Sequence, residues 1–467
     1  MKFISTRLTA PTLSFEDAVF QGLASDGGLY VPDFLPQFDE KKISEFKKLS
    51  YEELFFEVTR YFVESEIDSE SYKKIIKKSY ENFSHQSIAP IKQLSYNNFL
   101  LELFHGPTLA FKDFALQFLG NLLNHFLSKR SEKIVIIGAT SGDTGSAAIQ
   151  GCQGCANAKI FILHPHEKVS AVQRRQMTTT SAENVFNLAI EGNFDDCQAL
   201  VKKMFAEQSF LKGEKMIAVN SINFVRIMAQ IVYYFYAGLR LGADKAPISF
   251  SVPSGNFGDI YAGHLAKRMG LKINKLIIAT NSNDILVRFL AKNDYRKDAM
   301  IETISPSMNI QVSSNFERLL FDAHKTQRSE GKMPELMAEF ERTGFLKVPD
   351  EVLKIIQKDF DAFSCDDETT KKIINEIFKN TGETLDPHSA IGVYAAHKFF
   401  ESKNYNNEFI VSLATAHPAK FPEAVVSAGA PKPALPNFLK DLMEREEKFS
   451  VIKNSLEEVK QFIAERT

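Results

Sequence analysis

The sequence predicts an α/β protein with two open, twisted, mostly parallel β-sheets, a cleft between them and an additional amino-terminal lobe. Two observations carry this prediction. Short apolar runs alternate with helical patterns through the middle of the chain, which is typical of parallel β-α-β units. With 467 residues, of which 44% are hydrophobic, the chain is also long enough for two or three domains.

Eight apolar runs are predicted strands, and they fall into two series. The small sheet takes four runs between residues 133 and 221, which read KIVIIGA, KIFILHP, VFNLAIEG and KMIAVNS. Stretches that can form crossover helices follow the first three, as parallel strands require. The large sheet takes FLLELF, ISFSVP, KLIIATN and EFIVSLAT, so the small sheet is inserted between its strands. Ligands of such folds bind beyond the carboxyl ends of the strands, in a cleft between the two domains.

The domain boundaries follow from these patterns. Helical patterns in SYEELFFEVTRYFVES and SYKKIIKKSYENF mark the amino-terminal lobe, and the amphipathic SLEEVKQFIAER marks a tail. The expected parts are an amino-terminal α/β lobe (1–90), a large domain (91–130 and 222–440) with a helical insertion (about 282–380), a small domain (131–221) and a carboxy-terminal helical tail (441–467).

Charge and composition favour small-molecule chemistry. Lys and Arg number 56 against 58 Asp and Glu, a formal net charge of -2, which gives no overall signal for nucleic acid or an acidic membrane. No apolar stretch is long enough to span a bilayer, and the amino terminus lacks a secretory apolar region, so we expect a cytoplasmic protein.

The four cysteines are too few for a disulfide scaffold in a chain of this length. Cys152 and Cys155 form one C-x-x-C, but the second ligand pair that a structural zinc site needs does not follow. We expect both thiols to be buried on one face of a helix, and we assign no metal.

A glycine-rich turn, GATSGDTG at 138–145, follows the first strand of the small sheet. Thr140 stands where G-x-G-x-x-G needs its second glycine, and no G-K-[ST] is present, so neither a dinucleotide motif nor a P-loop is indicated. The helix after the turn is expected to start near Ser146. Its free backbone N–H groups, beside the hydroxyls of Thr140, Ser141 and Thr144, suit a carboxylate or a phosphate.

A second turn, SGNFG at 254–258, lies between the run ISFSVP and a predicted helix. Its glycines permit positive φ and a close approach of an anion to the backbone. A phosphate at the helix end could therefore be wrapped by Gly255, Asn256, Phe257 and Gly258. From the turn alone, a purely steric role for the glycines is an equal alternative.

Lys112 lies in the apolar run LAFKDFALQFLGNLL, where lysine is uncommon. Burial depresses the pKa of a lysine, and the neutral amine is the form that attacks an aldehyde to give a Schiff base. Alternatively, Lys112 extends from an amphipathic helix and pairs with Asp113 or another carboxylate. Local physics alone favours that structural alternative.

Several segments together decide between these readings. HGPTLAFKD, TSGDTGSAA, PSGNFGDIYAG and ATAHPAKF resemble, in this order, the signature segments of the threonine synthase family within the fold-type II pyridoxal-phosphate enzymes. FISTRLTAP, GLASDGGLYVP, NSINFVRIMAQIVYYF, SPSMNIQVSSNFERLLF and LDPHSAIGVYAA are similar to further segments of its longer, fungal-like and enterobacterial-like branch. The resemblance covers nearly the whole chain and implies a tryptophan synthase β-like fold.

The resemblance implies a binding site for pyridoxal 5'-phosphate. Lys112 would hold the cofactor as a Schiff base, and Ser254 with residues 255–258 would bind its phosphate. The hydroxyl of Thr415 would meet the pyridine nitrogen. A hydroxyl, unlike an aspartate, does not force protonation of that nitrogen, which suits the cofactor to elimination and replacement.

The TSGDTG turn resembles the loop that grips the substrate α-carboxylate in these enzymes, so we expect a substrate site formed by Thr140, Ser141, Asp143 and Thr144. Many relatives have Asn where this chain has Asp143, which leaves open whether Asp143 contacts the 3-hydroxyl of the cofactor.

Two segments offer ligands for the phosphate of the substrate. AVQRRQMTT contains Arg174 and Arg175, and NSINFVRIMAQ places Asn223, Arg226 and Gln230 on one face of a helix. Arg226 is the preferred ligand, because an arginine fork suits phosphate, although it also suits a structural carboxylate.

The resemblance implies conversion of O-phospho-L-homoserine and water into L-threonine and phosphate, the last step of threonine biosynthesis. Lys112 would then act as acid and base. We expect a monomer or a small homo-oligomer, although the sequence does not give the oligomeric state. One alternative is a phospholyase or dehydratase that uses the same cofactor and releases a 2-keto acid and ammonia. Another is a non-catalytic relative that binds pyridoxal phosphate or a phosphorylated metabolite. The matches outside the cofactor loops favour the synthase, and the presence of Lys112 argues against the non-catalytic relative.

Overall fold

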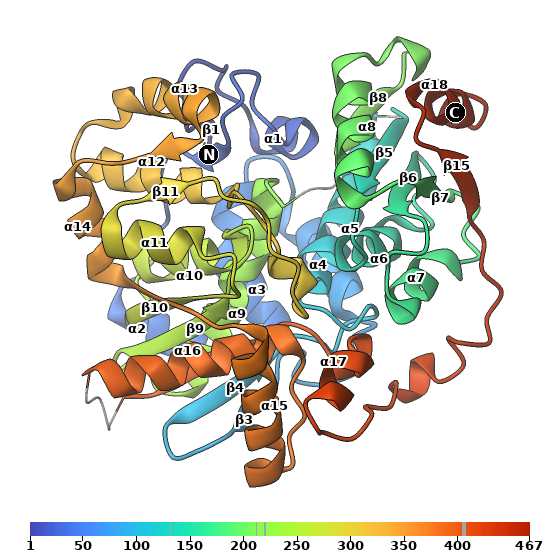
Figure 1. Cartoon of the computed structure of the whole chain (residues 1–467). Helices are drawn as coiled ribbons and strands as arrows, with labels where there is room; N and C mark the ends of the chain where they lie inside the picture. The colour runs from blue at the N-terminus through green and yellow to red at the C-terminus, as the bar shows by residue number, and fades with distance from the viewer. Residues whose placement is uncertain (131, 212, 219–220, 404–407) are drawn as a thin grey trace.

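The computed structural model describes residues 1–467 except 131, 212, 219–220 and 404–407 (Figure 1). Two larger β-sheets organise the molecule, as the sequence predicts. Helices cover both sheets, and the elements of the helical insertion lie beside the large sheet in yellow and orange in Figure 1.

The large sheet has six strands in the order β13-β10-β9-β14-β4-β3. They are β3 (Ile91–Gln93), β4 (Asn98–Glu102), β9 (Ile248–Pro253), β10 (Ile273–Thr280), β13 (Phe360–Ser364) and β14 (Ile410–Ala414). The four predicted runs form β4, β9, β10 and β14, which pair in parallel, and β3 is antiparallel to β4. β13 pairs in parallel with β10 within the stretch predicted as helical. Its sequence FDAFS is not predicted as a strand, because polar residues interrupt the apolar run.

The small sheet has five strands in the order β15-β7-β6-β5-β8, all parallel. They are β5 (Ile134–Ala139), β6 (Ala158–Pro165), β7 (Val185–Glu191), β8 (Lys215–Ala218) and β15 (Ser450–Lys453). The first four confirm the predicted runs, although Val219 and Asn220 of the fourth run lie outside the described residues.

The carboxy-terminal segment corrects the expectation of a purely helical tail. Its strand β15 extends the small sheet beside β7, and α18 (Leu456–Ala464) packs against α8 (Phe194–Ala206). In Figure 1 this red segment runs along the outside of the molecule before it joins the small sheet. Val459 and Ile463 of α18 are fully buried, so the last residues of the chain complete the core of the small domain.

The amino-terminal segment contains β1 (Phe3–Ser5), β2 (Tyr30–Pro32), α1 (Phe15–Gln21), α2 (Glu40–Phe46), α3 (Tyr51–Val63) and α4 (Ser69–Tyr80). The two strands pair antiparallel, and α3 and α4 confirm the predicted helical patterns. A capping box of Ser50 and Glu53 starts α3. The apolar side chains of this lobe share one continuous core with the helices of the large domain, so the lobe has no core of its own among the described residues.

The remaining helices connect the strands. They are α5 (Lys112–Arg130), α6 (Asp143–Cys152), α7 (Ala171–Thr178), α9 (Phe224–Arg240), α10 (Gly258–Arg268) and α16 (Pro387–Lys403), with α17 (Pro422–Ser427) near the carboxyl end. The insertion contains α11 (Ile285–Lys292), β11 (Tyr295–Arg296), α12 (Phe316–Thr326), α13 (Met333–Thr343), β12 (Phe345–Leu346), α14 (Asp350–Asp359) and α15 (Asp367–Thr381). Single 3-10 turns are η1 (Ser209–Leu211), η2 (Pro306–Met308), η3 (Glu330–Lys332), η4 (Pro418–Lys420) and η5 (Asn437–Leu439).

Helices α5 and α6 cross at two glycines. A Cβ added to Gly120 would lie 1.8 Å from the carbonyl oxygen of Gly151, and a Cβ on Gly151 would lie 2.2 Å from the backbone of α5. Glycine is therefore required at both positions for this close approach. Because α5 begins at Lys112 and α6 begins at Asp143, the crossing also sets how these two residues approach each other.

The cysteines and the helices bear on two of the sequence expectations. All four cysteines are free and buried. α6 ends at Cys152 and Cys155 lies beyond it, so the two thiols are buried as predicted but do not share a helix. Within the described ranges, no helix is both long and apolar enough to cross a membrane, and no cluster of His, Cys, Asp or Glu could hold a metal ion.

Candidate active site

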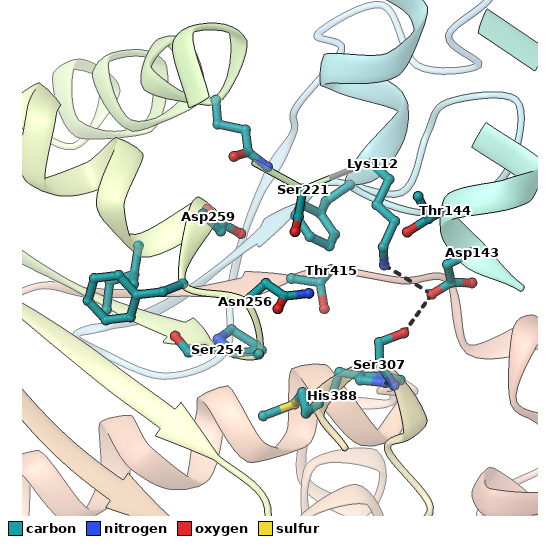
Figure 2. A pocket seen from close by; sticks show the side chains of 18 of the residues that line it. Lys112, Asp143, Thr144, Ser221, Ser254, Asn256, Asp259, Ser307, His388 and Thr415 are labelled. Carbon is teal, nitrogen blue, oxygen red and sulfur yellow. Dashed lines mark hydrogen bonds and ion pairs between the residues drawn. The ribbon is translucent and has the colours of Figure 1, made fainter. Parts of the chain in front are cut away.

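A pocket opens where the carboxyl ends of β9 and β14 meet the first residues of α5, α6 and α10 (Figure 2). Residues from both sheet units line it, as the fold class predicts. The polar residues of its wall include Lys112, Asp143, Thr144, Ser221, Arg226, Gln230, Ser254, Asn256, Asp259, Ser307, His388 and Thr415. The structure thus brings Lys112, the turn at 254–258 and Thr415 into one pocket.

Lys112 is the first residue of α5, and its side chain is 11% exposed. Its Nζ lies 3.3 Å from Oδ2 of Asp143 and 4.7 Å from the centroid of the Phe111 ring. Burial lowers the pKa of Lys112; the charge of Asp143 opposes this change, whereas those of Lys420 and Arg226 reinforce it. A lowered pKa favours the neutral amine that Schiff-base chemistry needs.

Asp113, the structural alternative considered as the partner of Lys112, forms hydrogen bonds with other residues. Its carboxylate accepts hydrogen bonds from the N–H and the hydroxyl of Thr108, both at 2.8 Å, and from Gln117 at 3.2 Å. Burial raises the pKa of Asp113 to about 6. The carboxylate that pairs with Lys112 therefore comes from the small domain and not from the next residue in the chain.

Asp143 is the first residue of α6 and binds four side chains. Its Oδ2 accepts from Lys112 at 3.3 Å and from the hydroxyl of Ser307 at 3.0 Å, which are the dashed lines of Figure 2. Its Oδ1 accepts from Gln173 at 2.8 Å and pairs with Lys420 at 2.8 Å. Although burial opposes it, Lys420 and Lys112 hold the pKa of Asp143 well below its usual range.

The turn before α6 presents fewer of its hydroxyls to the pocket than the sequence predicts. The hydroxyl of Thr140 accepts from two N–H groups of the turn itself, both at 2.9 Å, and Ser141 is exposed. Because α6 begins three residues before the predicted Ser146, Thr144 lies in its first turn and lines the pocket. Thr140 thus shapes the turn, whereas Asp143 and Thr144 face the pocket.

The turn at 255–258 presents free backbone N–H groups. Ser313 and Asn315 bind its carbonyl oxygens, and among the described residues none of its four N–H groups has a hydrogen-bond partner. Phe257 adopts a left-handed φ of 65°, and α10 begins at the next residue without a side-chain cap. A concave run of N–H groups at a helix amino end is an anion site.

Ser254 and Gly255 open this turn. The hydroxyl of Ser254 donates to the carbonyl oxygen of Val252 at 2.8 Å, so its proton is used within the protein. A Cβ on Gly255 would lie 2.8 Å from the carbonyl oxygen of Ser307. Glycine is therefore needed where the turn meets η2, and this contact forms part of the pocket wall.

Thr415 directly follows β14, and its backbone is tied on both sides. Its N–H donates to the hydroxyl of Ser389 at 3.1 Å, and its carbonyl oxygen accepts from the N–H of Phe111 at 2.8 Å. Its side chain lies in the pocket, as Figure 2 shows. Within the described part of the chain no protein group bonds to its hydroxyl, which is therefore available to a ligand.

Helix α9 directs Arg226 and Gln230 toward the pocket, whereas Asn223 serves the framework. The side-chain oxygen of Asn223 accepts from the N–H of Val225 at 3.1 Å as a helix cap, and its nitrogen donates to the carbonyl oxygen of Val19 at 2.8 Å. Of the three predicted residues of this face, two line the pocket.

Arg226 is a buried cation that forms no ion pair with any described residue. It is 4% exposed, and among the described residues no carboxylate pairs with it and its Nη1 has no hydrogen-bond partner. Burial lowers the pKa of Arg226 to about 10. Burying an unpaired charge is costly, so this arrangement is typical of a site that receives an anion.

Arg174 and Arg175 bind the carboxy-terminal segment. Arg174 donates to both oxygens of Glu447, at 2.8 and 3.0 Å. Arg175 lies 3.5 Å from the same carboxylate and donates to the carbonyl oxygen of Arg445 at 2.8 Å. These bonds hold α7 against the chain that leads to β15, so the structure gives no support to these residues as phosphate ligands.

Asp259 lies in the first turn of α10, directly after the turn at 255–258. Its Oδ1 accepts from the hydroxyls of Tyr233 and Tyr234, and its Oδ2 has no partner among the described residues. Burial raises the pKa of Asp259 to about 6. A carboxyl group with a raised pKa takes up a proton more readily when an anion binds beside it, which reduces the repulsion between them.

Sequence reasoning missed six polar residues of this pocket and its immediate support: Gln173, Ser221, Asp259, Ser307, His388 and Lys420. All six lie in segments that the resemblance or the search for phosphate ligands had already marked, for example Lys420 in ATAHPAKF. For Lys420, the available signal was a charged side chain within a marked segment that follows a buried strand.

Comparison with known proteins gives a consistent result along the chain. Family models described as Threonine synthase N terminus, Pyridoxal-phosphate dependent enzyme, and Threonine synthase, C-terminal, match residues 2–80, 88–346 and 389–463. A threonine synthase of Pseudomonas aeruginosa is 55% identical, over 100% of this chain and 98% of its own length. A threonine synthase of Saccharomyces cerevisiae is 42% identical, over 97% of each chain. The crystal structure of a pyridoxal-phosphate-bound threonine synthase from Brucella melitensis is 47% identical with a TM-score of 0.96, over 100% of this chain and 99% of that one.

Proposed function

The chain belongs to the threonine synthase family of pyridoxal-phosphate-dependent enzymes, and on that basis we propose how its pocket performs the reaction. The reaction converts O-phospho-L-homoserine and water into L-threonine and phosphate, which makes the protein a carbon-oxygen lyase acting on phosphates. One observation carries the assignment to this pocket: the buried amine of Lys112 shares it with the free N–H groups of the turn at 255–258.

The residues of the pocket fit pyridoxal 5'-phosphate. Lys112 supplies the amine for its aldehyde, the N–H groups at 255–258 supply donors for its phosphate, and Thr415 supplies a hydroxyl for its ring nitrogen. When bound, the cofactor draws electrons away from the α-carbon of an amino acid, which makes the neighbouring protons removable. Ser254 holds the turn in place, because its hydroxyl donates to the carbonyl oxygen of Val252 and its N–H donates to that of Ala279.

The substrate requires sites for two anions. We assign its phosphate to Arg226 and Gln230, because Arg226 has no counter-ion among the described residues and both side chains line the pocket. We assign its α-carboxylate to the amino end of α6, where Thr144 presents a hydroxyl to the pocket. Asn223 and Thr140 support these sites by holding α9 and the turn in place.

Proton transfer falls to Lys112. Its neutral amine would accept the α-proton of the substrate, pass it on, and then accept a β-proton as the γ-phosphate leaves. It would return one proton to the γ-carbon before water adds at the β-carbon, and one to the α-carbon afterwards. Arg226 holds the departed phosphate beside the carbon to which water adds, so this phosphate can accept the proton of that water. Water must be kept out before that step, and closure of the small domain over the pocket would do so.

Product analysis tests this function. Purified protein supplied with O-phosphohomoserine should release threonine and phosphate in equal amounts, with little 2-oxobutyrate. Keto acid and ammonia without threonine would instead support the phospholyase, and no turnover with retained cofactor would support a non-catalytic relative. The full-length similarity to threonine synthases supports the synthase over both.

Chemical trapping tests the role of Lys112. Borohydride should fix the cofactor to the peptide that contains Lys112, and Lys112→Ala should abolish both the visible absorbance and the trapped mass. Lys129→Ala is the matched control, because Lys129 lies exposed near the end of the same helix. Trapping on another lysine would contradict the assignment.

Two further expectations remain proposals. The four free cysteines support a cytoplasmic location, which co-fractionation with a cytosolic marker would test. We also propose a monomer or a small homo-oligomer; light scattering that gave a mass far above a small multiple of 52.7 kDa would rule this out.

A further inference from the structure

Two buried lysines share the carboxylate of Asp143. Lys420 lies at the end of η4 and is fully buried; its Nζ lies 2.8 Å from Oδ1 of Asp143 and 2.7 Å from the carbonyl oxygen of Thr108. Lys112 approaches the other oxygen of Asp143 at the longer distance of 3.3 Å. Lys420 therefore has two short bonds to acceptors, whereas Lys112 has one long bond.

The balance of charge around the pair is uneven. The titratable groups facing Lys112 are Asp143 from α6, Lys420 from η4, Arg226 from α9, Asp259 from α10 and His388 from α16. Asp143 is the carboxylate within ion-pair distance of either lysine among the described residues, and its other donors, Gln173 and Ser307, are neutral. One of the two lysines is in excess, and the one with the weaker bonds loses its proton first.

We propose that Lys420 is a positioning residue: it is the permanent counter-ion of Asp143, which leaves the Lys112 amine free to lose its proton and bind the cofactor. This inference rests on the proposed role of Lys112 as the cofactor lysine. Without Lys420, Lys112 is the remaining cation within ion-pair distance of Asp143 among the described residues, and the pair holds its proton.

Lys420 also joins three segments of the pocket. Through Thr108 it binds the loop before α5, through Asp143 it binds α6, and it is itself part of η4. The same carbonyl oxygen of Thr108 accepts from Gln176 of α7 at 3.0 Å. A merely structural role would use these bonds too, so the test needs a measurement that follows the charge of Lys112.

The pH dependence of cofactor attachment is that measurement. Cofactor-free protein is mixed with pyridoxal phosphate over a range of pH, reduced with borohydride, and analysed by mass for the fraction trapped on the Lys112 peptide. The variants are Lys420→Met, Asp143→Asn and the double variant, and Lys420→Arg is the control that keeps the charge. Thermal unfolding of each variant checks that it is folded.

The proposal fixes the order of the pH midpoints for attachment. Asp143→Asn should have the lowest midpoint, because it keeps the repulsion from Lys420 and loses the attraction. Wild type, Lys420→Arg and the double variant should lie close together, because in each the two effects are both present or both absent. Lys420→Met should have the highest midpoint, roughly one to three pH units above wild type, and should load more than tenfold slower at neutral pH.

A Lys420→Met midpoint equal to that of wild type would overturn the proposal and leave Lys420 a packing residue. If Lys420→Met does not fold, Asp143→Asn is compared with the double variant; equal midpoints there would overturn the proposal as well. The failure of the proposed function is distinct, because wild-type protein would then show no trapped cofactor on Lys112, and the inference would fall with it.

Discussion

Replacing Arg226 with Met should make the cofactor-free protein more stable, and it should abolish the activity of the cofactor-loaded enzyme. Arg226 is buried, and among the described residues its charge has no partner. Arg318→Met is a matched control, since Arg318 is an equally buried arginine that donates to the carbonyl oxygens of Tyr30 and Ile222 and to the side chain of Asn315.

The magnitude follows from the two pKa values. Burial lowers the pKa of both arginines from 12.5 to about 10, and at about 1.4 kcal/mol per pKa unit each buried charge costs roughly 3 kcal/mol. The folded state binds the proton less tightly than the unfolded state, so this cost is present at neutral pH and is relieved only as the pH rises through the folded pKa. Arg318 offsets the cost with hydrogen bonds to three residues, whereas the side chain of Arg226 makes none to the residues that the structure describes.

Arg226→Met should therefore stabilise the cofactor-free protein by about 1–3 kcal/mol, because a methionine of similar length fills the space without a charge. Arg318→Met should destabilise it by about 2–5 kcal/mol, because it leaves buried carbonyl oxygens without donors.

Thermal unfolding measures both effects. Adding inorganic phosphate to the cofactor-loaded protein should raise the unfolding temperature of wild type but not of Arg226→Met, since a ligand stabilises only the state that binds it. If Arg226→Met instead unfolds at a lower temperature than wild type, as Arg318→Met should, that result would refute the inference that the charge of Arg226 is uncompensated until an anion binds.

Three further predictions concern other parts of the molecule. Gly255→Ala should weaken cofactor affinity about 10- to 100-fold, because its Cβ would meet the backbone of η2; Gly331→Ala, which has open space, should leave the affinity unchanged, and titration of the visible absorbance distinguishes them. Hydrogen bonds from Arg174 lower the pKa of Glu447, so its stabilising contribution is present above its unfolded pKa and is lost as the pH falls through its folded pKa. Glu447→Gln should thus expose the carboxy-terminal segment to protease at neutral pH, where wild type resists; equal cleavage would contradict this. Burial raises the pKa of Cys152 to about 12, so its thiol should resist alkylation at mild alkaline pH until the protein unfolds, and rapid labelling of the native protein would argue against its burial.

Much of the fold could be predicted because eight of its strands are apolar runs of four to eight residues that the α/β alternation sets apart. The structure adds β3, β13 and β15, which lie at sheet edges and contain polar residues, as their sequences IKQ, FDAFS and SVIK show. Strands of this kind take their conformation from the neighbouring strand, so their own sequence gives little periodic signal.

The site divides in the same way. The turn at 255–258 and the place of Thr415 after a strand are local features, and the sequence predicts both. The ion pairs are not local. Lys112 pairs with Asp143, 31 residues away, and not with the adjacent Asp113. Lys420, near the carboxyl end of the chain, pairs with the same Asp143. Such contacts depend on how two domains pack, which no single segment encodes.

The angle at which α5 and α6 cross sets the distance between Lys112 and Asp143. Gly120 lies eight residues beyond Lys112, and Gly151 lies eight residues beyond Asp143. The helical segments between the crossing point and these two residues, here called arms, are therefore equal in length. At 1.5 Å per residue each arm is about 12 Å long, and a change of about 5° in the crossing angle moves its tip by about 1 Å. A shift of that size separates a hydrogen bond from no bond. A methyl group added at Gly120 or Gly151, remote from the pocket, would therefore change the distance between the amine of Lys112 and the carboxylate of Asp143.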